Sequence, residues 1–443
     1  MARQTAAAGP GGARSLIPRS PALRESSWRE ADALLVPPPP AALADPWRAV
    51  ALDELLAHLA SLHSARAPLA DLAGPARALM EWGWAAPGAD PLQQSRAAER
   101  LRQAADALRT ALVGDTVTFV VNRNLNTSNH CLLHCGFCAF RRDPGQEGAY
   151  RLPLDELQRR AAEARQLGAT ELCLQAALDP QARLDGSAVA FAERLLQALA
   201  EAAPGLHLHA FSPQELIWFA ESDGMPLDRV LERLRAAGLG SVPGTAAEVL
   251  SERVRRVLCP EKLSARAWVA VMHQVHSHGL ASTSTLMAGH LEGPADRAAH
   301  LLTLLALQRR AQDQGLAGFS EFVLLPFVGA AAPAPLRARV GRDQPDPAAM
   351  LQLTAQARLL LGPAIPHHQS SWVKLTLPVA AEALRWGCDD LGGTLMEEHI
   401  TTMAGARGGT AQTPEALAAA AHGQGRPVRQ RTTLYGQPER MAA

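Results

Sequence analysis

Cysteine is scarce in this sequence: only six occur among 443 residues. Six are too few for a disulfide scaffold, and three of them, Cys131, Cys135 and Cys138, fall within eight residues. Such clustering favours a metal site in a reducing compartment. The isolated cysteines are predicted to be buried thiols; they are Cys173, Cys259 and Cys388.

Net charge and long apolar runs are lacking as well. The 43 basic residues balance the 43 acidic ones, so nucleic acid and anionic membranes have no support as main partners. No apolar run approaches the roughly 20 residues of a membrane helix. We therefore expect a soluble, cytoplasmic protein. The first 24 residues carry arginines and no acid, which resembles a transit peptide, but a disordered extension is favoured over it.

Four regions are predicted along the chain. Residues 1–45, with prolines at 37–40, should form a flexible Ala/Pro-rich extension. Residues 46–113 show the three- and four-residue apolar spacing of helices. In residues 114–390 six or more apolar strands alternate with helices, which predicts an α/β fold with a TIM-like (β/α) barrel. Residues 391–443 are predicted as a C-terminal helical extension.

A barrel of this kind places its active site where strands end and loops begin. TVTFVVNRNL, residues 116–125, is the first predicted strand, and the cysteine cluster follows it. Gln175 and His209 lie at the ends of the next two predicted strands, and His290 follows a later one. These placements agree with one another and predict a site at one end of the barrel.

The cysteines are spaced C-x3-C-x2-C. Three thiolates fit three corners of a 4Fe–4S cluster and leave one iron open to a ligand. A closed zinc site needs four ligands. His130 or His134 could supply the fourth, so zinc is the alternative.

This spacing resembles the signature of the radical S-adenosylmethionine (SAM) superfamily. The resemblance implies that the open iron binds the amino and carboxylate groups of SAM. One electron then cleaves SAM to methionine and a 5′-deoxyadenosyl radical. It also implies that Phe137 lies at the adenine and makes Gln175 a candidate for SAM binding. Glu248 and Arg255, seven residues apart on one predicted helix face, are candidates for SAM's ribose and carboxylate, with a solvated helix face as the alternative.

A closer resemblance covers about residues 114–435. The blocks HAFSPQE, SVPGTAAEVL, SSWVKL, DDLGGTLMEEHIT and RQRTTLYG resemble the FO synthase subunit 2 family, the 5-amino-6-(D-ribitylamino)uracil–L-tyrosine 4-hydroxyphenyl transferases of deazaflavin (coenzyme F420) biosynthesis. The resemblance implies that the 4-hydroxybenzyl group of L-tyrosine is joined to 5-amino-6-(D-ribitylamino)uracil. It also implies a companion FO synthase subunit and an electron donor such as flavodoxin or ferredoxin as partners. A single cysteine motif excludes the fused two-activity form.

Among the remaining candidates, His209 and His290 are predicted substrate contacts, with a structural role as the alternative. Glu397 and Glu398 are interpreted as helix N-terminal charges rather than an acid/base pair. No residue is assigned a catalytic role. Four residues are expected to brace the cluster loop, with contact to a ligand as the alternative: Asn122, Arg123, Asn124 and Asn126.

Four residues, at three places in the sequence, depart from the family pattern. Ala176 and Ala177 stand where Gly-Gly is common and could crowd SAM, because backbone often approaches its amino group there. Ala288 replaces a usual tyrosine, and Gly329 replaces a usual histidine. Two rivals therefore stay open: a related radical SAM enzyme such as aminofutalosine synthase of menaquinone biosynthesis, and a non-catalytic iron–sulfur or zinc protein.

Overall fold

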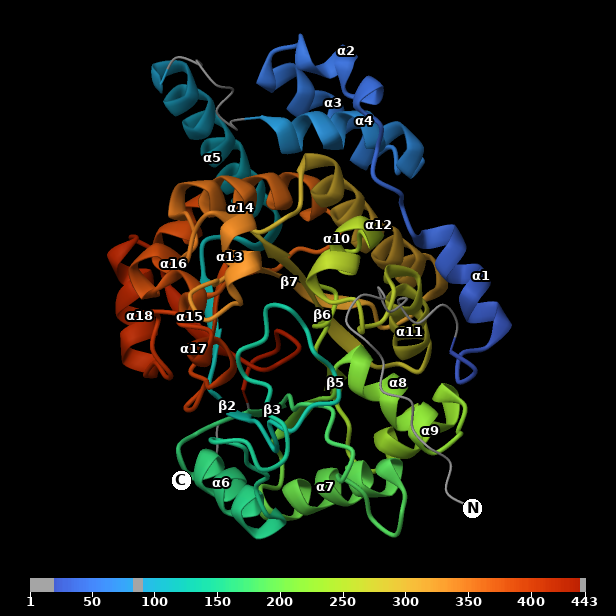
Figure 1. Ribbon diagram of the computed structural model, residues 1–443. Helices are drawn as coiled ribbons and strands as arrows, with labels where there is room; N and C mark the ends of the chain where they lie inside the picture. Colours follow the sequence, from blue (N-terminus) through green and yellow to red (C-terminus); the bar gives the residue numbers. More distant parts are fainter. Residues whose placement is uncertain (1–19, 83–90, 439–443) are drawn as a thin grey trace.

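A computed structural model describes residues 20–82 and 91–438. Its centre is one sheet of ten parallel strands in the order β10-β1-β9-β8-β7-β6-β5-β4-β3-β2. Helices surround this sheet (Figure 1). The strands are β1 Val117–Val120, β2 Asn122–Leu125, β3 Glu171–Leu174, β4 His207–Ala210, β5 Ser241–Val242, β6 Ala281–Ala288, β7 Phe319–Pro326, β8 His368–Ser370, β9 Asp390–Gly393 and β10 Val428–Arg431.

The strand predicted over residues 116–125 is broken at Val121 into β1 and β2. β1 pairs with β9 and β10, whereas β2 pairs with β3. The backbone N–H of Asn124 in β2 also donates to the carbonyl of Leu395, just past β9. This segment therefore contacts both β9 and β3, and the sheet curls into a barrel. The predicted α/β barrel class is confirmed.

Helices cover the outside of the barrel because their apolar faces match its outer surface. In α9, Leu227, Val230, Leu231 and Leu234 are buried at three- and four-residue spacing. The covering helices are α6 Leu154–Gln166, α7 Ala188–Ala202, α8 Pro213–Ser222, α9 Leu227–Ala236, α10 Glu252–Leu258, α11 Ala265–Ser277, α12 Pro294–Gln314, α13 Ala334–Val340, α14 Pro347–Leu361 and α16 Leu377–Ala383. The short helix α15 Trp372–Leu375 follows β8 and faces the barrel interior.

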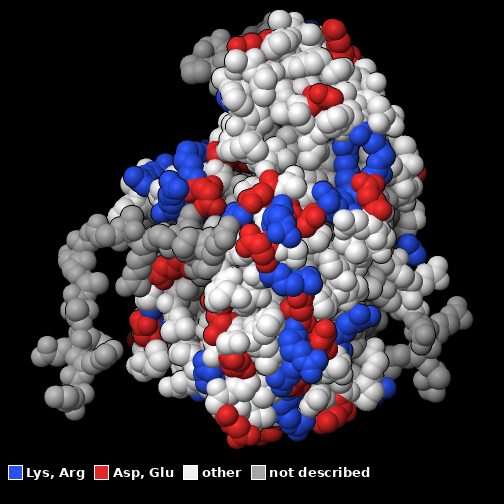
Figure 2. All heavy atoms as spheres, turned by 90° about the vertical axis from the view of Figure 1, so that its right-hand side faces the viewer, with Lys and Arg blue, Asp and Glu red and all other residues white. Residues whose placement is uncertain are grey.

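A group of helices precedes the barrel and lies at the top of Figure 1. It consists of α2 Asp45–Arg48, α3 Leu52–Ser64, α4 Leu69–Glu81 and α5 Pro91–Val113. None of the helices within residues 20–82 and 91–438 combines the length and hydrophobicity that a bilayer crossing requires. On the face of Figure 2, acidic and basic side chains are interspersed, in agreement with the balanced charge.

The prediction of a flexible extension over residues 1–45 is wrong for α1, Glu25–Leu34. Trp28, Ala31 and Leu34 are buried at three-residue spacing, so this helix has an apolar stripe. The guanidinium of Arg266 in α11 lies 4.7 Å from the centre of the Trp28 ring. Packing against the barrel helices therefore orders α1. Residues 1–19 lie outside the described residues.

The C-terminal segment is only partly helical, with α17 Ile400–Met403 and α18 Pro414–Gly423. Beyond α18 the chain returns to the barrel and forms β10, which pairs with β1 from Val117↔Val428 onward. β10 continues the sheet because Arg431 enters the barrel and forms ion pairs with Asp390 and Glu321. The barrel thus extends past residue 390, where the sequence predicted its end.

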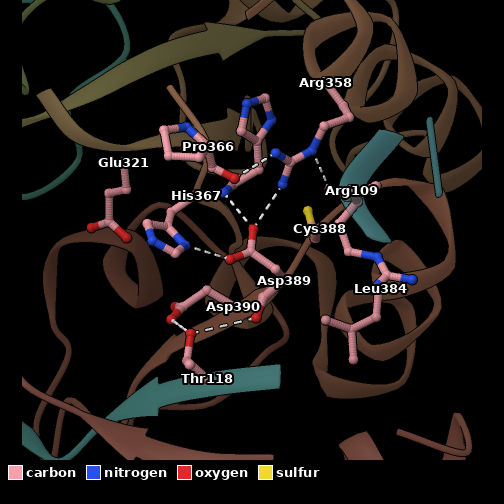
Figure 3. A network of polar contacts seen from close by, with 12 residues as sticks. Arg109, Thr118, Glu321, Arg358, Pro366, His367, Leu384, Cys388, Asp389 and Asp390 are labelled. Carbon is pink, nitrogen blue, oxygen red and sulfur yellow. Dashed lines mark hydrogen bonds and ion pairs between the residues drawn. The ribbon is translucent and has the colours of Figure 1, made fainter. Parts of the chain in front are cut away.

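A buried polar network connects α14 to the residues at the start of β8 and β9 (Figure 3). Asp389 accepts hydrogen bonds from Arg358 Nη2, His367 Nδ1 and the backbone N–H of His368, each at 2.7 Å. Arg358 is fully buried. Burial alone would raise the pKa of Asp389, but the His367 hydrogen bond and the Arg358 charge hold it below the ordinary value.

Candidate active site

The barrel encloses a cavity of about 380 Å³. β6 and β7 contribute alternate residues to its wall, because successive side chains of a strand point to opposite faces. The inward set is Thr283, Thr285 and Met287 from β6, and Glu321, Val323 and Leu325 from β7. The cavity is therefore polar at the start of these strands and apolar towards their ends.

The cysteine loop lies over one end of this cavity, and Cys131, Cys135 and Cys138 all line it. Backbone hydrogen bonds fix the loop: Gly136 N donates to the carbonyl of Leu258 at 2.9 Å, and Leu132 N donates to that of Leu178 at 3.1 Å. All three cysteines thus line the same cavity, and their joint role as cluster ligands stays a prediction.

The donors that line the cavity at the loop are three thiols, without either of the two histidines that could complete a four-ligand zinc site. Burial raises the pKa of the Cys135 and Cys131 thiols, so a strong positive charge is needed to hold them as thiolates. Neither His130 nor His134 lines the cavity, and His134 bonds to Glu261 and Arg141 outside it.

Phe137 and Glu248 both line the cavity, as expected of SAM contacts. Glu248 is not on a helix, however: it precedes α10 with a φ of 45°. Its carboxylate pairs with Lys262 Nζ at 2.6 Å, and that ammonium lies 5.3 Å from the centre of the Phe137 ring. Burial would raise the pKa of Glu248, but Lys262 holds it below the ordinary value.

Arg255 does not reach the cavity. It is fully buried, and its guanidinium donates to the carbonyls of Leu263, Ala247 and Ala246. The shared helix face predicted for Glu248 and Arg255 is wrong, because α10 begins only at Glu252. Arg255 holds together the loop that carries Glu248, and Lys262 is the cation beside that carboxylate.

Gln175, Ala176 and Ala177 line the cavity just after β3. Gln175 Nε2 lies 3.8 Å from Cys173 Sγ, and the backbone N–H of Ala176 donates to Glu215 Oε1 at 3.3 Å. Burial raises the pKa of Glu215 to about 7. Glu215 caps α8 in a capping box with Ser212, and the S-x-x-E pattern of the sequence was a signal that the sequence-based prediction did not use.

The two candidate histidines differ in position. His209 of β4 lines the cavity, with Nδ1 bonded to Ser241 Oγ at 2.7 Å, and burial lowers its pKa to about 4. His290 is buried outside the cavity lining, and its Nε2 lies 3.0 Å from the carbonyl of Met287. The predicted substrate contact by His290 therefore has no support in the structure.

Ala288 and Gly329, two of the departures from the family pattern, also lie outside the cavity lining. A Cβ on Gly329 would lie 2.8 Å from the ring of Phe327, so a histidine does not fit there without movement of that ring. Local packing thus accounts for glycine at this position, and neither residue removes a polar group from the cavity.

The neighbouring carboxylates Glu397 and Glu398 have different contacts. Glu397 pairs with Arg123 and Arg160 on the outside of the barrel. Glu398 lines the cavity, and its carboxylate accepts the N–H groups of Thr401 and Thr402 at the start of α17. The predicted role of a helix N-terminal charge thus fits Glu398, whereas Glu397 serves ion pairs.

The asparagines before the cysteine loop act partly as expected. Asn122 donates to Glu171 Oε1 at 2.7 Å and accepts the N–H of Leu395 at 2.9 Å. Asn126 donates to the carbonyl of Gln175 at 2.7 Å. Both brace the loop's surroundings. Asn124 lines the cavity, and its Oδ1 has no hydrogen-bond partner among the described residues.

A polar floor of the cavity was not predicted from the sequence. It consists of Glu171, Glu321, Gln369, Arg431 and Thr433, which come from β3, β7, β8 and the β10 end of the chain. Only the fold brings these residues together, although the RQRTTLYG block contains two of them.

The comparisons with known proteins agree with this geometry. Residues 125–304 match the model of the radical SAM superfamily. Two solved structures share the fold. Methylornithine synthase (PylB) matches with a TM-score of 0.58 and 15% identity, over 82% of this chain and 94% of its own. The FeFe-hydrogenase maturase HydG from Carboxydothermus hydrogenoformans matches with a TM-score of 0.60 and 15% identity, over 93% of this chain and 84% of its own. The barrel and its cysteine loop are thus those of a radical SAM enzyme.

Two similar relatives narrow the class further. One from Synechocystis sp. is 54% identical over 76% of this chain and 86% of its own length. One from Gloeobacter violaceus is 55% identical over 76% of this chain and 86% of its own length. Both are named 5-amino-6-(D-ribitylamino)uracil–L-tyrosine 4-hydroxyphenyl transferase. The chain belongs to this family of transferases, and the predicted resemblance is confirmed.

Proposed function

We propose that this enzyme joins the 4-hydroxybenzyl group of L-tyrosine to 5-amino-6-(D-ribitylamino)uracil. The observation that supports this most is that three cysteine thiols open into an enclosed, partly polar cavity in a chain of this family. Cys131, Cys135 and Cys138 would hold a 4Fe–4S cluster. When bound, the cluster and SAM supply the one-electron cleavage of SAM that yields a hydrogen-abstracting deoxyadenosyl radical.

The residues near the cysteine loop are suited to hold SAM. Phe137 presents an apolar ring to the cavity, and Gln175 presents an amide. Glu248 is already paired with Lys262, so a ligand there meets a neutral ion pair rather than an isolated buried charge. We propose that this side of the cavity binds SAM, with the Ala176 and Ala177 methyls accommodated in its wall.

The polar floor is suited to a uracil with a ribityl chain, because both carry many hydrogen-bonding groups. His209 contributes an uncharged imidazole near pH 7, since its lowered pKa keeps it neutral. Ser241 occupies Nδ1 and leaves Nε2 for a ligand. The barrel wall keeps bulk solvent from these groups and thereby strengthens each hydrogen bond. A companion FO synthase subunit and an electron donor such as flavodoxin or ferredoxin remain proposed partners.

The decisive experiment is anaerobic reconstitution followed by an assay with SAM, tyrosine and the ribitylaminouracil. We expect about four irons and four sulfides per chain, release of 5′-deoxyadenosine and a hydroxybenzyl–uracil adduct. Phenylalanine should be rejected by roughly 10⁴-fold, because a site that hydrogen-bonds the phenol leaves its own polar groups unpaired.

Matched variants distinguish loss of the cluster from loss of the folded structure. Cys135→Ala should lose the cluster, whereas Cys259→Ala should keep it, because Cys259 is a buried thiol that does not line the cavity. Turnover of a futalosine-pathway substrate without adduct formation would reject the proposal. A protein that holds one zinc and no iron would also reject it.

A further inference from the structure

Lysine occurs only twice in the whole sequence, at Lys262 and Lys374, although lysine and arginine together number 43. Arginine therefore serves at every other cationic position, including the surface ion pairs. Both lysines line the central cavity. An ammonium is a compact point charge with three donors, whereas a guanidinium is a larger planar fork. The lysines thus stand where a small cation fits the space.

The two lysines differ in what they contact. Lys262 Nζ is engaged by Glu248 at 2.6 Å. The ammonium of Lys374, in α15, makes no hydrogen bond or ion pair with any of the described residues, yet the charges of Glu398 and Glu248 act on it. Both carboxylates have closer partners, because Lys262 pairs with Glu248 and the α17 backbone caps Glu398. The Lys374 ammonium is therefore left for a ligand.

We propose that Lys374 binds the α-carboxylate of the amino-acid substrate, an inference that rests on the proposed function. Two ligands of the reaction carry an α-amino acid end, tyrosine and SAM. The superfamily resemblance assigns the SAM end to the cluster iron, so the second carboxylate needs a cation of the protein. Glu398 lies nearby, is paired with no cation among the described residues, and suits the ammonium of the same zwitterion.

Burial lowers the pKa of Lys374, which increases its reactivity in reductive methylation. A chain with two lysines gives a simple readout: mass spectrometry of the anaerobically reconstituted protein, after labelling, resolves Lys374, Lys262 and the N-terminal amine as separate peptides. We expect L-tyrosine to protect Lys374 from methylation several-fold. Tyramine, which lacks the carboxylate, and SAM should leave its labelling unchanged. Protection by SAM alone, or equal protection by tyramine, would overturn the proposal.

Variants give an independent measurement. Lys374→Met should raise the Kd for tyrosine about 10- to 100-fold, because a charge-assisted hydrogen bond is lost. Its Kd for tyramine should match that of the parent. Lys374→Arg should recover part of the tyrosine affinity. Arg229→Met removes one exposed cation and is the control, with tyrosine binding unchanged. Equal loss of tyrosine and tyramine binding in Lys374→Met would contradict a carboxylate contact.

The outcomes also separate this proposal from the proposed function. If the parent forms the adduct while tyrosine leaves Lys374 labelling unchanged, the carboxylate site is rejected and the transferase reaction stands. If tyrosine protects Lys374 but no adduct forms, the carboxylate site stands and the transferase reaction is rejected.

Discussion

Asp389→Asn tests the buried network of Figure 3. The substitution keeps the shape of the side chain and removes its charge. Arg358 then remains buried without a counterion, although its guanidinium still donates to the carbonyls of Gly387 at 2.6 Å and Pro366 at 2.5 Å. His368 N–H bonds to one oxygen of Asp389 and His367 Nδ1 to the other, but an amide has a single acceptor oxygen, so one of these two bonds meets the amide NH2 group and is lost or reversed.

The expected loss follows from these contacts. Removal of one partner of a buried ion pair costs about 3–5 kcal/mol. Because two carbonyls still accept hydrogen bonds from Arg358, we expect the loss in the free energy of unfolding to be near the lower limit, about 3 kcal/mol. The pair Arg66–Asp313 has a similar N–O distance, 2.6 Å, but both side chains are more than half exposed. Asp313→Asn should therefore cost at most about 1 kcal/mol.

The assay is denaturant unfolding of the parent, Asp389→Asn and Asp313→Asn at pH 7, with circular dichroism as the signal. A second variant, Arg358→Met combined with Asp389→Asn, should recover part of the loss, because no unpaired charge is then buried. Equal midpoints for Asp389→Asn and Asp313→Asn would refute the reasoning that burial sets the cost.

The pH dependence gives a further check on Asp389. Its pKa is lowered in the folded state, so its contribution to stability is complete above the unfolded value of about 3.9. That contribution is lost as the pH falls below about 4, through the folded pKa. The difference between the parent and Asp389→Asn should therefore be constant from about pH 5 to 7 and shrink in acid. A difference that grows in acid would contradict the lowered pKa.

Three further predictions concern other parts of the barrel. Burial raises the pKa of Glu321 to about 7, so parent stability should fall as the pH rises from about 4.5 to 7; Glu321→Gln should flatten this dependence in denaturation midpoints, and an unchanged slope would contradict it. Gly244→Ala should lower thermal stability by roughly 1–3 kcal/mol, because the added Cβ would lie 1.8 Å from the carbonyl oxygen of Thr283; an unchanged melting temperature would refute the clash. Trp28→Ala should cost about 3–5 kcal/mol and speed hydrogen exchange in α1; unchanged exchange would show that Trp28 does not hold the helix.

The elements predicted best from sequence are those whose burial is continuous. β7, α11 and α12 contain long apolar stretches, and β6 ends in one, so the alternation of strands and helices could be predicted from the sequence. β8 and β10 were missed because they are short and polar: their sequences are HQS and VRQR. Polar strands occur here because their side chains serve the buried network and the cavity floor rather than an apolar core.

The same distinction applies to the site. The three cysteines lie within eight residues, so local spacing was enough to predict their convergence. Arg431 and Glu321 are 110 residues apart, and only the return of the chain after α18 brings them together. One cation faces the two carboxylates Glu321 and Asp390 there. No pattern in the sequence relates these residues before the strand order is known.

The surroundings of Glu248 show how an assumed helix led to a wrong placement. Sequence reasoning put Arg255, seven residues later, on the same helix face as Glu248 and made both candidates for SAM binding. Ala246 and Glu248 instead adopt left-handed φ values of 61° and 45°, which no helix contains. The chain therefore turns before α10 begins, and Arg255 is used to hold that turn. Lys262, beyond the end of the helix, comes back to Glu248 and becomes its partner in the cavity.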